Sequence, residues 1–282
     1  MNWERLTVWT VATLLVVVSV GVGFLGTPHS ATVDEIQTVE RNPAVTVSSL
    51  GDGYVLSPGE GAAGNDGATS TALVFYPGGR VHPNAYVPVL APVVERTGVT
   101  IFVPKPPLYL AVLDVDAADR IVADHPEITE WYVGGHSLGG AMACRYVAQS
   151  SEDLTGLVLF AAYCDRDVRE TDVGVLAVRG GRDTVLDAEE YRKNRGNLPA
   201  DETVEVTIEG MNHSQFGAYS GQSGDARATI PDDVAHEALQ DELVEFLRSQ
   251  DRGATAVNSS TATVPSVAVD TTGDTPSAVW AW

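Results

Sequence analysis

The sequence predicts an α/β protein in which a mostly parallel sheet is covered by helices on both faces and is preceded by a transmembrane helix. Short apolar runs alternate with segments of helical spacing, which is typical of parallel strands buried between helices. The first apolar run, residues 6–26, is long enough to cross a bilayer. The 282 residues, 44% of them hydrophobic, suffice for one domain of about 200 residues with appendages.

The run at residues 6–26 contains no charged residue and predicts a single membrane span. Arg5 and the α-amine precede it, and no Lys or Arg follows before Arg41. The positive-inside rule therefore places the N-terminus, residues 1–5, in the cytoplasm and the rest of the chain outside the cell membrane. A cleavable signal peptide is the alternative, but the run is long and lacks a small-x-small cleavage site. We therefore expect an uncleaved signal anchor.

Composition divides the chain after the span into three parts. Residues 27–43 are typical of a linker, and residues 44–249 carry the periodic apolar pattern of a folded domain. From residue 250 to residue 282 the chain is dominated by Ser, Thr, Ala, Val and Gly without periodicity, which predicts a disordered tail.

Within the folded domain, apolar runs bounded by turn residues predict strands, and helical periodicity predicts the segments between them. The predicted strands are residues 45–47, 54–56, 71–76, 99–103, 131–133, 157–161, 175–179 and 204–208. The predicted helices are residues 86–97, 111–124, 138–149, 188–195 and 233–248. The first two strands flank Gly51-Asp52-Gly53 and are expected to form a hairpin. The alternation of later strands with helices favours parallel pairing.

The charge balance is strongly acidic, with 38 Asp and Glu residues against 17 Lys and Arg and a net charge of -21. Only two of the cations are lysines, Lys105 and Lys193. An acidic, lysine-poor surface is typical of proteins from salt-loving microbes, because high ionic strength screens its self-repulsion. The same charge argues against nucleic acid as a partner and against docking on an anionic membrane surface.

The two cysteines, Cys144 and Cys164, are too few for a disulfide framework and do not form a Cys-x-x-Cys motif. They could pair in an extracytoplasmic domain. Our default expectation is two buried free thiols, and we expect no metal site.

A possible nucleophile lies between the predicted strand at residues 131–133 and the predicted helix at residues 138–149. Gly135-x-Ser137-x-Gly139 fits the nucleophile-elbow pattern, in which a serine occupies a strained turn from strand to helix. Glycines allow the close backbone approach and unusual torsion angles of such a turn. The helix dipole and its free N–H groups then favour negative charge developing beside Ser137.

A serine nucleophile needs a base, and the base needs an acid to hold its tautomer. In the strand–turn–helix arrangement the acid follows the serine along the chain and the base comes last. Asp183 follows the predicted strand at residues 175–179, at the edge where α/β enzymes bind ligands, and is our candidate acid. Asp165 and Asp187 are weaker rivals, because Asp165 follows an earlier strand and Asp187 is expected to cap the next helix.

His213 is the candidate base, because it comes just past the strand at residues 204–208. The later His236 falls within the last predicted helix, where we expect a solvated surface residue. His136 adjoins Ser137, but consecutive residues of the turn point apart, so local packing or bonding is expected. The histidines that precede the serine and break the order are His29, His82 and His125.

The oxyanion of an acyl-transfer intermediate needs two backbone N–H donors. One is expected from Leu138, the residue after the serine, and the other from the loop after residues 71–76. In that loop Gly79 is the candidate donor. Arg80 and His82 follow it and either line the pocket or are solvated.

Four motifs together resemble the α/β-hydrolase superfamily. They are Tyr76-Pro77-Gly78-Gly79, Gly134-Gly135-His136-Ser137-Leu138-Gly139-Gly140, Gly180-Gly181-Arg182-Asp183 and Gly210-Met211-Asn212-His213. Over residues 45–248 the chain looks like the compact group called α/β-hydrolase fold-5, which is related to dienelactone hydrolases. Dienelactone hydrolases have a cysteine nucleophile where this chain has Ser137, so the resemblance does not carry over their substrate. The short connection at residues 162–174 leaves no room for a large cap domain.

The sequence thus predicts a membrane-anchored serine hydrolase that acts on a small-molecule acyl ester and needs no cofactor. Acyl transfer to an alcohol through the same covalent intermediate is one alternative. A non-catalytic binding protein on a hydrolase scaffold is another, since fold does not determine function.

Overall fold

The computed structural model describes residues 28–63, 70–150 and 152–261, the last eleven of them as backbone only. An eight-stranded sheet in the order β1-β2-β4-β3-β5-β6-β7-β8 forms its centre. The strands are β1 Val45–Leu50, β2 Gly53–Pro58, β3 Thr71–Tyr76, β4 Thr100–Val103, β5 Glu130–His136, β6 Leu154–Phe160, β7 Gly174–Gly180 and β8 Thr203–Ile208. β2 is antiparallel to β1 and to β4, and all other neighbours are parallel. The predicted hairpin and the mostly parallel sheet are both confirmed.

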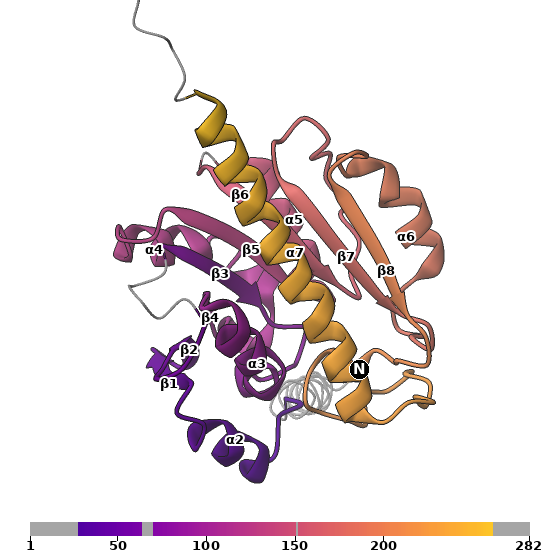
Figure 1. The fold of residues 1–282 in the computed structure, drawn as a ribbon. Coiled ribbons are helices and arrows are strands. Elements are labelled where there is room, and N and C mark those ends of the chain that lie inside the picture. The colour runs from indigo at the N-terminus through magenta and orange to yellow at the C-terminus, as the bar shows by residue number, and fades with distance from the viewer. Residues whose placement is uncertain (1–27, 64–69, 151, 262–282) are drawn as a thin grey trace, which may run out of the picture.

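Helices cover both faces of the sheet (Figure 1). The α-helices are α2 Val33–Glu40, α3 Val87–Thr97, α4 Ala117–Asp124, α5 Leu138–Gln149, α6 Ala188–Asn194 and α7 Asp232–Thr261. Single 3₁₀ turns lie at Pro83–Tyr86, Pro107–Tyr109, Ala111–Leu113, Arg195–Asn197 and Ser214–Phe216. Residues 161–173, between β6 and β7, contain neither helix nor strand, so this connection carries no cap domain.

Alternation along β3 builds two separate cores. Leu73 and Phe75 point to the face covered by α3 and α7, whereas Val74 and Tyr76 point to the face covered by α4 and α5. Side chains in a strand alternate between its faces, so a strand buried on both sides is apolar throughout. This explains why residues 71–76 are an uninterrupted apolar run.

The structure differs from our expectation of a linker over residues 27–43. Thr32 begins α2 with a capping box in which its hydroxyl accepts from the Glu35 amide and the Glu35 carboxylate accepts from the Thr32 amide. Ile36 and Val39 of this helix pack against the core on the α3 side. Before it, His29 forms a parallel bridge with Val81. The folded part of the chain therefore begins by residue 29.

The last helix is longer than the 233–248 segment predicted from its periodicity. α7 runs to Thr261 and so enters the stretch from residue 250 that we expected to be disordered. In Figure 1 this helix crosses the front of the sheet. The remainder of the predicted tail, residues 262–282, lies outside the described residues.

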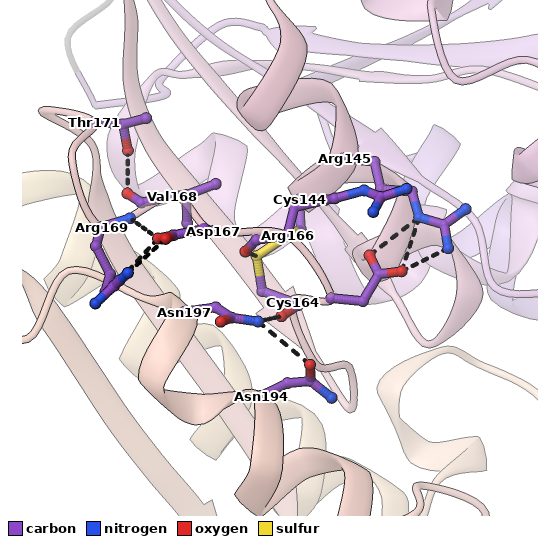
Figure 2. The surroundings of a disulfide bond; sticks show 11 residues. Cys144, Arg145, Cys164, Arg166, Asp167, Val168, Arg169, Thr171, Asn194 and Asn197 are labelled. Carbon is purple, nitrogen blue, oxygen red and sulfur yellow. Dashed lines mark hydrogen bonds and ion pairs between the residues drawn. A yellow bond between two sulfur atoms is a disulfide. The ribbon is translucent and has the colours of Figure 1, made fainter.

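The expectation of two free thiols was wrong, because Cys144 and Cys164 form a disulfide. Their Cα atoms lie 5.4 Å apart, although 20 residues separate them in sequence. Figure 2 shows the bond joining helix α5 to the loop after β6. The Asn197 side chain donates to the Cys164 carbonyl at 2.9 Å, and Arg145 forms an ion pair with Asp165 at 2.6 Å. The disulfide thus links α5, the helix that follows Ser137, to the loop between β6 and β7.

Of the described helices, none combines the length and the apolarity needed to cross a bilayer. The predicted span at residues 6–26 and the predicted cytoplasmic residues 1–5 lie outside the described residues.

Candidate active site

Ser137 occupies the turn between β5 and α5, as the strand–turn–helix pattern predicted. Its φ of 53° and ψ of -120° are rare for a residue with a side chain, and such strain persists only where the surroundings enforce it. The Ser137 amide donates to the Phe160 carbonyl at 2.8 Å. A Cβ added to Gly135 would lie 2.6 Å from the carbonyl carbon of Gly139, so glycine is required for this close approach.

Asp183 and His213, predicted as acid and base, form a buried hydrogen-bonded pair. His213 Nδ1 lies 2.8 Å from Asp183 Oδ2, and the two side chains are 1% and 2% exposed. The other carboxylate oxygen of Asp183 accepts from the amides of Val185 at 2.8 Å and Leu186 at 2.9 Å. A carboxylate held at both oxygens can fix Nδ1 of the imidazole as the protonated nitrogen.

The free nitrogen of His213 is enclosed. Nε2 is buried and has no hydrogen-bond partner among the described residues. Ser137 Oγ and His213 Nε2 therefore do not form a hydrogen bond in this structure. The His213 ring lies 4.5 Å, centroid to centroid, from the ring of His136, the residue before Ser137.

Asp225 holds the backbone of the His213 loop, and the sequence did not reveal this. Its carboxylate accepts from the His213 amide at 3.1 Å, from the Ser214 amide at 2.8 Å and from the Ser214 hydroxyl at 2.7 Å. The neighbouring Ala226 amide donates to the Thr184 hydroxyl at 2.8 Å, next to Asp183. The loop that carries Asp225 thus connects the candidate acid to the candidate base.

The candidate oxyanion donors lie next to each other. A Cβ added to Gly79 would lie 3.3 Å from Cδ2 of Leu138. Leu138 is the first residue of α5, where a helix offers its own amides no acceptor. The Gly79 amide donates to no other described residue. Neither amide is thus engaged by another described residue.

The side chains of Tyr86 and His136 pack beside the loop that carries Gly79, and Tyr86 is bonded to the loop. The sequence did not reveal this role. The Tyr86 hydroxyl accepts from the Gly78 amide at 2.8 Å and lies 3.0 Å from His136 Nδ1. Burial raises the pKa of Tyr86, so the phenol keeps its proton and can donate it to Nδ1. Burial, and secondarily the nearby His213, lowers the pKa of His136 well below its ordinary value. His136 is therefore neutral at neutral pH. Its ring stacks against Phe216, with centroids 5.5 Å apart.

The rival acids have other partners. Asp165 forms the ion pair with Arg145, whose hydrogen bonds lower the pKa of this carboxyl. Asp187 caps α6 as predicted, accepting from the amides of Glu189 and Glu190 at 2.8 and 3.0 Å. Neither carboxylate is bonded to a histidine.

Three other histidines lie outside the Asp183–His213 pair. His236, which we expected to be solvated, is half-buried on α7, and burial lowers its pKa. His82 caps the 3₁₀ turn after the oxyanion loop by accepting from the Asn84 amide at 3.1 Å. His125 pairs with Glu127 at 2.9 Å. None of these three contacts the Asp183–His213 pair through a hydrogen bond.

Within residues 28–63, 70–150 and 152–261, no group of three or more His, Cys, Asp or Glu side chains is placed to hold a metal ion.

Comparisons with known proteins agree with this architecture. The model of the alpha/beta hydrolase family matches residues 72–237, more than half of the chain. A thermophilic esterase from the Planctomycetes species Thermogutta terrifontis, solved with propionate, has 16% identity and a TM-score of 0.51 over 73% of this chain and 94% of that chain. A fungal esterase from Rhizomucor miehei has 14% identity and a TM-score of 0.53 over 77% and 86%. A predicted CIB-like hydrolase from Thermoplasma acidophilum has 14% identity and a TM-score of 0.51 over 73% and 97%.

At these identities the solved structures establish a shared fold. The search of curated proteins found no match.

Proposed function

Because the chain belongs to the α/β-hydrolase family, we propose that it is a serine hydrolase that cleaves a small-molecule acyl ester outside the cell membrane, to which residues 6–26 anchor it. The observation that carries this proposal is the buried Asp183–His213 hydrogen bond of 2.8 Å, at the same sheet edge as the strained turn of Ser137. A base paired with its acid, at the sheet edge that also carries a serine, is the arrangement that activates a hydroxyl nucleophile.

In the proposed first half-reaction, Ser137 Oγ bonds to the ester carbonyl carbon and its proton passes to His213 Nε2. Asp183 stabilises the imidazolium that forms, and the amides of Gly79 and Leu138 bind the oxyanion. The bond from carbon to the leaving oxygen then breaks, and the alcohol leaves with the proton from Nε2. In the second half-reaction water attacks the acyl-enzyme, gives a proton to Nε2, and the acid leaves as Ser137 regains its hydrogen.

An ester substrate is favoured by the relatives of similar fold. The proteins from Thermogutta terrifontis and Rhizomucor miehei are described as esterases, and the former was solved with propionate. The connection at residues 161–173 carries no cap domain over the site.

The disulfide supports the proposed location. Cys144 and Cys164 are paired. Disulfides form and persist mainly in oxidising compartments outside the cytoplasm. This agrees with the orientation that the positive-inside rule predicts for a span at residues 6–26.

Ser137→Ala tests the proposal directly. It should lower kcat for p-nitrophenyl acetate by about 10⁶-fold, as removal of a serine nucleophile does in related chemistry. Ser48→Ala, which changes an exposed serine on β1, is the matched control and should keep the parental rate. A fluorophosphonate probe should label the parent on Ser137. Full activity in Ser137→Ala, or a folded parent that takes no label, would refute the proposal.

A further inference from the structure

Three large apolar side chains lie exposed in the segment that follows β4. Leu108, Val112 and Leu113 are 57%, 45% and 52% exposed, and we call these three residues the apolar rim. The other exposed large apolar side chains of the described chain are scattered over different elements: Val33 on α2, Val204 on β8 and Val234 on α7. Clustered exposure of this kind, unlike scattered exposure, marks a contact surface.

The backbone holds the rim in an unusual conformation. Leu108 and Tyr109 both have positive φ, 53° and 58°, which residues with side chains rarely adopt. The Tyr109 amide donates to the Pro106 carbonyl at 3.0 Å, and the Leu110 amide donates to the Pro107 carbonyl at 3.1 Å. The exposure of Leu108 is therefore built into an ordered turn.

The rim borders the proposed oxyanion loop. β4 lies next to β3 in the sheet, so the segments that follow these strands meet at one edge. The Arg80 amide donates to the Tyr109 carbonyl at 2.8 Å. A Cβ added to Gly79 would lie 3.9 Å from Cδ2 of Leu110. A molecule held on the rim is thus close to the proposed nucleophile.

The first described residues are tied to the same loop. The His29 amide donates to the Arg80 carbonyl at 2.8 Å, and the His82 amide donates to the His29 carbonyl at 2.7 Å. Arg80 therefore joins His29 on one side to Tyr109 on the other. Gly26, the last residue of the proposed span, is three residues before His29, a reach of at most about 11 Å for an extended chain.

Acidic residues are sparse in the sequence that leads to the rim. Residues 67–113, which include the oxyanion loop and the rim, contain one acidic residue, Glu95, in a chain that has 38. The next acidic residue, Asp114, forms an ion pair with Arg120. Residues 27–33 contain none. A net charge of -21 opposes electrostatic docking on an anionic membrane, so we expect any contact there to be apolar.

We propose that the apolar rim rests on the lipid bilayer and that the site takes lipophilic esters dissolved in that bilayer. This inference rests on the proposed function and on the anchor at residues 6–26. Because the anchor ends only three residues before His29, the domain lies close to the membrane. The part of the domain nearest the bilayer is then the sheet edge that carries Gly79, Ser137 and the rim. Leu108, Val112 and Leu113 enter the interface, and an acyl chain passes over Leu110 to the oxyanion loop.

Photolabelling of the full-length chain in vesicles tests the contact. The vesicles are neutral phosphatidylcholine with a diazirine on one acyl chain, and adducts are located by peptide mass mapping. We expect adducts on the rim and none on Val204, which is 50% exposed on β8, the last strand of the sheet. Rim labelling should persist at high salt, because salt screens charge and strengthens apolar contact. An unlabelled rim, facing water or a second copy of the chain, or equal labelling of Val204, overturns the proposal.

Hydrolysis in the same vesicles tests the substrate class. Leu108→Ser/Leu113→Ser should lower the ratio of long-chain to acetyl p-nitrophenyl ester hydrolysis roughly tenfold, because interfacial binding scales with the apolar area buried. Val204→Ser should leave the ratio unchanged. An unchanged ratio in the rim variant contradicts the inference. The labelling is repeated on Ser137→Ala: rim adducts without any serine-dependent hydrolysis would refute the proposed function and leave the bilayer contact standing.

Discussion

The hydroxyl oxygen of Tyr86 lies 3.0 Å from Nδ1 of His136 and also accepts from the amide of Gly78 at 2.8 Å. One buried oxygen thus connects the residue before the candidate nucleophile to the loop that carries the candidate oxyanion donor. Tyr86 thereby fixes the spacing between its own segment and that of His136, which is 50 residues later in sequence.

Tyr86→Phe removes this connection and leaves two buried polar groups without a partner. We expect the free energy of unfolding to fall by about 2 kcal/mol, since an unsatisfied buried group costs about 1–3 kcal/mol. We expect kcat for p-nitrophenyl acetate to fall roughly tenfold, less than the loss of an oxyanion donor itself. Urea unfolding and steady-state kinetics give the two numbers.

Tyr191→Phe is the matched control for that variant. Tyr191 is also buried, and its hydroxyl donates to Glu205 on β8 at 3.1 Å rather than to a candidate site residue. Tyr191→Phe should have a lower free energy of unfolding than the parent and an unchanged kcat. Equal losses of kcat in the two variants would mean that Tyr86 acts on stability alone.

Asp183→Asn keeps the shape of the acid and removes its charge. We expect kcat to fall about 10⁴-fold, because an amide neither stabilises the imidazolium nor holds the reactive tautomer. Asp165→Asn is the control, since its carboxylate pairs with Arg145 instead. A loss in Asp165→Asn as large as in Asp183→Asn would transfer the role of acid to Asp165.

Stability should fall as the pH drops below about 6.5, the ordinary pKa of histidine. Burial lowers the pKa of His136, so the unfolded chain binds a proton there that the folded chain refuses. Stability therefore rises with pH through this range, and one such group costs about 1.4 kcal/mol one pH unit below 6.5. Urea unfolding at pH 7.5 and 5.5 measures the difference.

His136→Asn isolates that residue, because the other histidines with lowered pKa, His82 and His236, remain in both proteins. The variant should lose less stability than the parent between the two pH values. Identical losses would show that His136 is not responsible for the pH dependence.

Reduction of the Cys144–Cys164 bond should lower the free energy of unfolding by about 3 kcal/mol, the chain-entropy value for a loop of this length. Thermal unfolding with and without dithiothreitol measures it, and Cys144→Ala/Cys164→Ala should match the reduced parent. Without reductant, iodoacetamide should modify neither cysteine of the folded chain. Alkylation of both would contradict the pairing.

Local pattern was enough to predict the sheet edge on which the candidate residues gather. Short apolar runs bounded by turn residues distinguished the strands from the helices, whose apolar residues recur with a period of 3.6. The carboxyl ends of parallel strands all meet at one edge of the sheet. Ser137, Asp183 and His213 each follow the carboxyl end of a parallel strand. This shared position predicts that the three residues lie at the same edge of the sheet. In the structure, His213 Nδ1 lies 2.8 Å from Asp183 Oδ2.

Contacts between segments far apart in sequence became visible only in the tertiary structure, because no periodic pattern in the sequence predicts them. The sequence left the pairing of Cys144 and Cys164 open, since it gives no measure of the distance across α5 and β6. The roles of Tyr86 and Asp225 depend on loops that meet only because the order of the sheet places β3 beside β5 and β7 beside β8. The packing of α2 and the bridge from His29 to Val81 likewise follow from burial against a completed core. Strands and turns are determined by neighbours along the chain, whereas the support of the site is determined by neighbours in space.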